Sequence, residues 1–160
     1  MGLGHTVRGF VRLGHRDQFR LVAAWSLLGF CRLLILLLPF RVVRRLLGEH
    51  QSRAPDQAPA PAPLDPVHRA RAERIGLVVT LAAQHTPWKS ECYPQALAAR
   101  GFLTARRIPH RVCFGVRRDG SALVAHAWVQ AGDITVTGGT EKVFTEVGSF
   151  SWSPRVGRRG

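Results

Sequence analysis

Residues 87–97 read Pro-Trp-Lys-Ser-Glu-Cys-Tyr-Pro-Gln-Ala-Leu, and this stretch decides the fold. Its first half has the proline and polar residues of a turn, and from Cys92 to about Arg106 apolar residues recur at helical spacing. The sequence therefore predicts a helix that begins at a cysteine. A thiolate there is stabilised by unpaired backbone N–H groups and by the positive end of the helix dipole. Cys92 is on this ground the candidate nucleophile.

A lone histidine stands in a predicted strand further along the chain, where residues 125–129 read Ala-His-Ala-Trp-Val. An imidazole near a thiol can take its proton, so Cys92 and His126 together predict a cysteine hydrolase. Plain packing is the alternative for both: a half-buried cysteine, and a histidine hydrogen-bonded on a sheet face. Side chains alternate across a strand, so Trp128 is expected beside His126, where it either shields the site or packs in the core. Trp88 precedes Cys92 by four residues and has the same two interpretations.

A third group normally orients the imidazole of such a site. Asp133 is the first carboxylate after His126 and is therefore a candidate catalytic residue. However, Gly132-Asp133 is also a common turn pair, and the tip of a hairpin is too far along the strand for a hydrogen bond to His126. Rival orienting groups follow it in the sequence: Glu141 and the hydroxyls of Thr135 and Thr137.

Composition limits the class of protein. The 160 residues allow about one domain, and a net charge of +13, from 23 basic and 10 acidic residues, favours an acidic peptide or a lipid surface as partner. No nucleic-acid partner is expected, because no known nucleic-acid-binding pattern accompanies the charge. Three cysteines in unlike surroundings predict no disulfide framework and a cytoplasmic protein, with Cys31 and Cys113 buried in apolar runs. No ligand spacing for a metal is present, so we expect neither a metal nor another cofactor.

The chain divides by composition into four segments. Residues 1–50 form a basic and apolar helical segment, 51–66 a linker of proline and alanine, 67–147 the catalytic domain, and 148–160 a loose basic tail. The apolar run at 21–40 contains Arg32, which costs about 2.5 to 3.5 kcal/mol at the centre of a membrane span. Packing on the protein or a partner, contact with a membrane surface, and a span all remain open for this run. A signal peptide fits poorly because the basic region is long and no cleavage motif follows it.

The catalytic segment predicts two helices followed by an antiparallel sheet, which is an α+β fold. The helices are expected at 67–84 and 92–106. Hairpin turns at Asp119-Gly120 and Gly132-Asp133 separate strands expected at 111–117, 123–130 and 134–137. A short fourth strand is expected at 142–146.

The order of these motifs resembles the B2 proteins of lasso peptide biosynthesis, which are transglutaminase-like cysteine peptidases. The resemblance rests on Pro-Trp-x-x-x-Cys, then Gln-Ala-Leu-Ala, Arg-Arg-Ile-Pro, Phe-Gly-Val, His-Ala-Trp-Val and Val-Thr-Gly, across residues 67 to about 146. The upstream Leu-Leu-Pro-Phe-Arg at 37–41 is similar to the helical segment that such proteins carry. The resemblance implies a transglutaminase or papain-like core that removes the leader peptide from a ribosomally made precursor. Cys92 would be the nucleophile and His126 the general base.

The resemblance also implies partners and exposes one departure. Family members act with a small leader-recognition protein, and a separate ATP-using lasso cyclase closes the freed core peptide. The family's third catalytic residue is usually an aspartate on the strand after the histidine, about where Thr137 and Gly138 stand here. Either another group replaces it or the site is a dyad. Two alternatives to hydrolysis therefore stay open: acyl transfer to an amine, and a non-catalytic scaffold that holds precursor and cyclase together, at a membrane or in solution.

Overall fold

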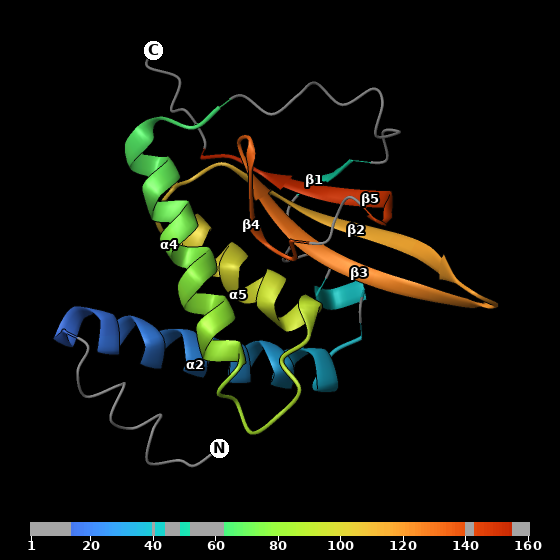
Figure 1. Cartoon of the computed structure of the whole chain (residues 1–160), viewed down its shortest axis with the longest axis horizontal. Coiled ribbons are helices and arrows are strands. Elements are labelled where there is room, and N and C mark those ends of the chain that lie inside the picture. The colour runs from blue at the N-terminus through green and yellow to red at the C-terminus, as the bar shows by residue number, and fades with distance from the viewer. Residues whose placement is uncertain (1–13, 40, 44–48, 52–62, 140–142, 155–160) are drawn as a thin grey trace.

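The computed structural model describes residues 14–39, 41–43, 49–51, 63–139 and 143–154 (Figure 1). In the described residues the elements follow one another in this order: α2 (His15–Leu37), β1 (Glu49–Gln51), α4 (Pro66–Ala83), α5 (Cys92–Ala105), β2 (His110–Asp119), β3 (Ala122–Ala131), β4 (Ile134–Thr137) and β5 (Thr145–Trp152). The predicted α+β class is confirmed, with helices first and the antiparallel sheet after them.

The sheet is antiparallel, and its strand order is β1-β5-β2-β3-β4. Its longest pair is the β2–β3 hairpin, which turns at Gly120 with a positive φ of 60°, as the Asp-Gly pair predicts. Helices α2, α4 and α5 gather on one side of the sheet in Figure 1. Of these, α5 contacts β3 most extensively and α4 contacts β4. The start of α5 is thereby held close to the middle strands.

Local sequence explains why α4 begins and packs where it does. The carboxylate of Asp65 caps the helix by accepting hydrogen bonds from the backbone N–H groups of Val67 and His68, each at 3.0 Å, and Pro66 occupies the first turn. Gly76 faces β4 so closely that a Cβ at this position would overlap the carbonyl oxygen of Val136. A glycine is therefore what allows α4 to lie directly against the edge of the sheet.

The N-terminal helix α2 belongs to the core. It starts earlier than the apolar run suggests, and three residues spaced along one face, Ala24, Leu28 and Cys31, are buried against the cluster that the other helices and the sheet form. It contacts both α4 and α5. In the described residues, the segments 1–50 and 67–147 that composition separates therefore share one core, and β1 also pairs with β5 of the sheet. Most of the predicted linker at 51–66 lies outside the described residues.

The sheet continues into the predicted tail. Instead of a short strand at 142–146, β5 covers Thr145–Trp152, so the prediction of a loose tail from 148 is wrong as far as Trp152. Phe150 is buried in the core opposite Val112 of β2. Alternation of serine with aromatic residues at 149–152 is a strand pattern. In the structure the neighbours Ser149 and Phe150 are both buried, so β5 is covered on both faces at this point. Residues 155–160 lie outside the described part.

Candidate active site

A short loop between α4 and α5 positions Cys92. The hydroxyl of Thr86 lies 2.9 Å from the carbonyl oxygen of Trp88 and 2.9 Å from the hydroxyl of Ser90, and the Gln95 side-chain amide donates to the Ser90 carbonyl at 2.7 Å. These bonds tie both ends of the loop to the first turn of α5. The backbone that leads into Cys92 is thus held by hydrogen bonds within its own segment.

Trp88 belongs to this loop, but it packs away from the candidate site. Its ring lies 4.8 Å from the ring of Trp25 in α2, and it covers Gly29, where a Cβ would come within 3.0 Å of the indole. Of its two predicted interpretations, packing is the one that the structure supports. Trp88 anchors the loop to α2.

Cys92 is the first residue of α5, as predicted. Its side chain is half-buried and packs against the core, and the preceding residue, Glu91, makes no side-chain hydrogen bond to the helix end. Pro94 has no N–H group and the N–H of Gln95 donates to the Glu91 carbonyl at 3.3 Å, so Cys92 and Tyr93 supply the backbone N–H groups at this end of α5. The arrangement suits a thiolate and the oxyanion that forms when it attacks a carbonyl.

The other two cysteines are buried thiols. Burial raises the pKa of Cys31 to about 11 and the pKa of Cys113 to about 12. Both therefore stay protonated at neutral pH, because the interior disfavours the charged thiolate. The predicted burial of both is confirmed, and Cys31 lies in the apolar core. Cys113 instead lies beside polar side chains, with its Sγ 3.8 Å from the Gln130 side-chain oxygen.

His126 lies on β3, half-buried between two aromatic rings. Its imidazole stacks on Phe144 with centroids 4.6 Å apart and on Trp128 at 6.0 Å. Trp128 is only 3% exposed, so it does shield His126, as the alternation along the strand predicts. The Nε2 of His126 lies 3.4 Å from the carbonyl oxygen of Gly138, just beyond β4.

Cys92 and His126 lie on opposite faces of the sheet. Ala127, next to His126, is part of the core shared with the helices, and so is its cross-strand partner Phe114. The ring of Tyr93, which follows Cys92, lies 5.7 Å from the ring of Phe114, which marks the face that α5 covers. Successive side chains of a strand point to opposite faces, so His126 points away from α5. The structure does not bring the two candidates together on one face.

Two glycines mark the face on which His126 lies. Gly115 is directly opposite His126 on β2, and a Cβ there would come within 2.8 Å of the Trp128 indole. Gly138 has a φ of 81°, and a Cβ there would meet the Cβ of Trp128 at 2.6 Å. The bulky tryptophan therefore requires glycine at both neighbouring positions. This requirement explains why position 138, next to the imidazole, is a glycine.

Asp133 takes part in a different interaction. Both of its carboxylate oxygens contact the Arg69 guanidinium of α4, at 2.8 and 2.6 Å, and this hydrogen-bonded contact lowers the pKa of Asp133. It lies in the turn between β3 and β4, at the far end of β3 from His126. The structure assigns Asp133 to the attachment of this turn to α4, and its candidacy as a catalytic residue is corrected accordingly.

Two of the rival orienting groups lie on β4. Thr135 lies opposite Gln130, and Thr137 is buried opposite Val129, where its hydroxyl finds no hydrogen-bond partner among the described residues. Glu141 lies outside the described part of the chain. The Gly138 carbonyl lies beside His126, and no sequence pattern indicates this contact. Phe144 was also not predicted, because ring stacking between distant segments leaves no local signal.

The comparisons with known proteins give one family. The profile of the transglutaminase-like superfamily matches residues 34–149, from the last turn of α2 into β5. No curated protein and no solved structure matches the chain. Since the match covers most of the sequence and includes the cysteine helix and the histidine strand, the chain belongs to the transglutaminase-like superfamily.

Proposed function

We propose that this protein is a cysteine peptidase that removes the leader peptide from a ribosomally made lasso peptide precursor. The observation that carries the proposal is the position of Cys92 as the first residue of α5, beside helix N–H groups that no side chain caps. The superfamily supports thiol chemistry at this helix. The order of motifs around Cys92 and His126 supports the choice of substrate.

The reaction follows from the groups available. The Cys92 thiolate attacks the carbonyl carbon of the last leader residue, and the first N–H groups of α5 stabilise the oxyanion. Collapse of the tetrahedral intermediate breaks the C–N bond, and His126 gives its proton to the departing amine of the core peptide. Water then attacks the thioester while His126 takes a proton from it, which releases the leader carboxylate and restores the thiol.

His126 must reach the face of α5 for this chemistry. The β3–β4 pairing is irregular between Val129 and Gln130, but the extra residue there is Val136 of β4, and β3 keeps its register with β2 on both sides of His126. We propose that binding of the precursor with its leader-recognition protein moves β3 relative to α5 so that His126 reaches Cys92. The freed core peptide then passes to the lasso cyclase.

Reconstitution tests the proposal directly. A lasso peptide precursor is incubated with the protein and a leader-recognition protein, and the products are read by mass spectrometry. Cys92→Ala and His126→Asn are expected to abolish cleavage, whereas Cys31→Ala, which removes a buried thiol, is expected to retain it. Full cleavage by Cys92→Ala would overturn the proposal. The product mass also separates hydrolysis, which adds water, from acyl transfer, which adds the amine.

A non-catalytic scaffold is the second candidate, and a specific observation favours it. His126 faces away from Cys92, and the Gly138 carbonyl lies beside its Nε2. A scaffold would bind precursor and cyclase without cleaving the leader. A scaffold function predicts that the protein binds the leader fully but does not cleave it under any condition that supports cyclase activity.

A further inference from the structure

The solvent-facing side of α2 carries an apolar stripe that is interrupted at its middle by the exposed Ser26. Six large residues on this side are well exposed: Phe19, Val22, Phe30, Leu33, Leu36 and Leu37. Five of them follow a spacing of three, eight, three and four residues from Phe19 to Leu37, which places them on one stripe of the helix. The stripe is about 27 Å long at 1.5 Å per residue. A helix on the surface of a soluble protein normally turns polar residues outward, so this stripe requires an explanation.

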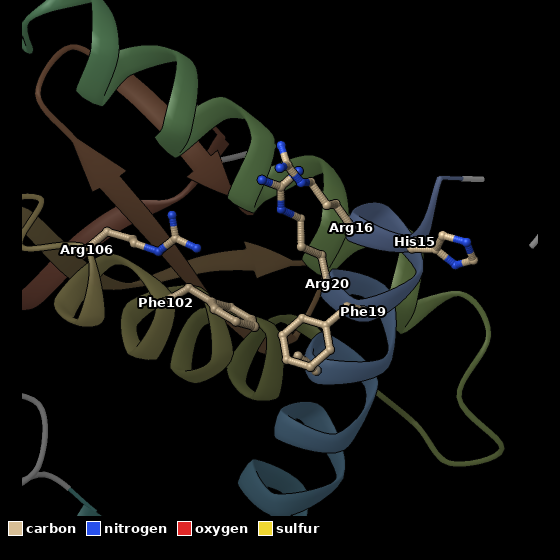
Figure 2. A pocket seen from close by; sticks show the side chains of 7 residues that line it. His15, Arg16, Phe19, Arg20, Phe102 and Arg106 are labelled. Atoms are coloured by element: carbon tan, nitrogen blue, oxygen red, sulfur yellow. The ribbon is translucent and has the colours of Figure 1, made fainter.

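Arginines flank the stripe at its N-terminal end. Figure 2 shows Arg16 and Arg20 of α2 and Arg106 of α5 around the rings of Phe19 and Phe102, at an open pocket of about 370 Å³. Asp17 is the acidic residue near this group, and its Oδ1 lies 2.8 Å from the guanidinium of Arg20 and 3.7 Å from that of Arg74. The surroundings of the pocket thus remain positively charged and suit an anionic group next to an apolar surface.

The opposite side of α2 fixes how the helix can meet a membrane. By length and composition α2 could cross a bilayer, and 17% of its most apolar window is buried in the protein. That buried part includes Leu28, at 0% exposure, and its neighbours in the shared core. Insertion of α2 as a span would strip these side chains from α4 and α5. A helix that is anchored on one side and apolar on the other lies along the interface instead.

We propose that the outer face of α2 binds the surface of an anionic phospholipid membrane. The apolar stripe enters the boundary of the acyl chains, and the arginines at the pocket bind lipid phosphates. The net charge of +13 adds a long-range attraction to the same surface. This proposal stands on α2 alone and is independent of the reaction at Cys92.

Co-sedimentation of the full chain with vesicles tests the proposal. Vesicles of phosphatidylcholine with 30% phosphatidylglycerol, about a third anionic lipid, are compared with phosphatidylcholine alone, at low and high salt. Binding is expected to the anionic vesicles and to weaken with salt. The double variant Leu33→Glu with Leu37→Glu is expected to reduce vesicle binding more than tenfold. The double variant Arg16→Gln with Arg106→Gln is expected to reduce vesicle binding about fivefold for each arginine removed.

A matched control uses another exposed leucine. Leu77 of α4 is 69% exposed, close to the 70% of Leu37, and Leu77→Glu is expected to leave vesicle binding unchanged. Equal binding to both kinds of vesicle, or equal loss with Leu77→Glu, would overturn the proposal. So would resistance to extraction by alkaline carbonate, which indicates a span. A dimer in solution that dissociates in the variant Leu33→Glu with Leu37→Glu would also overturn the proposal. The stripe would then be the contact surface for a second copy of the chain.

Discussion

The Nε2 of His126 lies 3.4 Å from the carbonyl oxygen of Gly138. This carbonyl is a neutral hydrogen-bond acceptor. It can accept the imidazole N–H and so orient the ring on β3. The contact joins His126 to the segment that follows β4.

Thiol labelling is predicted to separate Cys92 from the other two cysteines. Burial raises the pKa of Cys31 and Cys113 to about 11 and about 12, so neither thiol reacts readily in the folded protein. Brief exposure to iodoacetamide at pH 7, followed by peptide mass spectrometry, should modify Cys92 alone. In denaturant all three should react at similar rates. Modification of Cys113 before Cys92 in the folded state would contradict the described burial.

Removal of the Asp133 carboxylate is predicted to leave catalysis nearly unchanged. Asp133→Asn loses the ion pair with Arg69, and Arg69→Gln loses the same pair from the other side, so the two variants should behave alike. Both are expected to cleave precursor within about twofold of wild type, because an exposed ion pair contributes little. A loss of a hundredfold in Asp133→Asn, without one in Arg69→Gln, would return Asp133 to the catalytic site.

His110 is predicted to make stability fall in mild acid. Its ring is buried against Trp152 and lies 2.8 Å from the Ile108 carbonyl through Nδ1, and burial lowers its pKa to about 4. The unfolded chain takes up this proton near pH 6.5, so the free energy of unfolding should decrease by about 3 kcal/mol as the pH falls from 6.5 to 4. Urea unfolding across this range measures the slope. His110→Phe keeps the ring stack and should flatten the slope, and an unchanged slope would assign it to other groups.

Close approach between α4 and β4 gives a prediction about stability. Gly76→Ala places a methyl group against the Val136 carbonyl, where neither backbone can move easily. The expected loss is at least about 1 to 3 kcal/mol of unfolding free energy, despite the better helix propensity of alanine. Gly14→Ala, where a Cβ meets nothing, is the control. Equal thermal midpoints for the two variants would contradict the described packing.

The elements of the catalytic segment were predictable because their signals are local. Asp65-Pro66 starts a helix through its own hydrogen bonds, and Asp119-Gly120 turns a hairpin through its own backbone angles, so both appear in the sequence. The beginning of α5 at Cys92 follows from the same kind of pattern. Contacts between distant segments leave no such signal. The pairing of β1 with β5 and the packing of α2 into the core are of this second kind.

The site was predictable in its parts but not in its assembly. Alternation along β3 correctly placed Trp128 beside His126, but it could not indicate which face α5 would cover. That face is set by the burial of Ala127 and Phe114, which depends on the whole sheet. The attachment of Asp133 to Arg69 joins residues 64 positions apart and was equally hidden.

The covalent intermediate tests the central claim most directly. If Cys92 is the nucleophile, acid quenching of precursor cleavage should trap the leader on the protein as a thioester, with the mass of the released leader minus water. Digestion should locate this adduct on the peptide that contains Cys92, and hydroxylamine should remove it. Cleavage of the precursor that proceeds in Cys92→Ala, with no adduct at any cysteine of the wild type, would contradict the account.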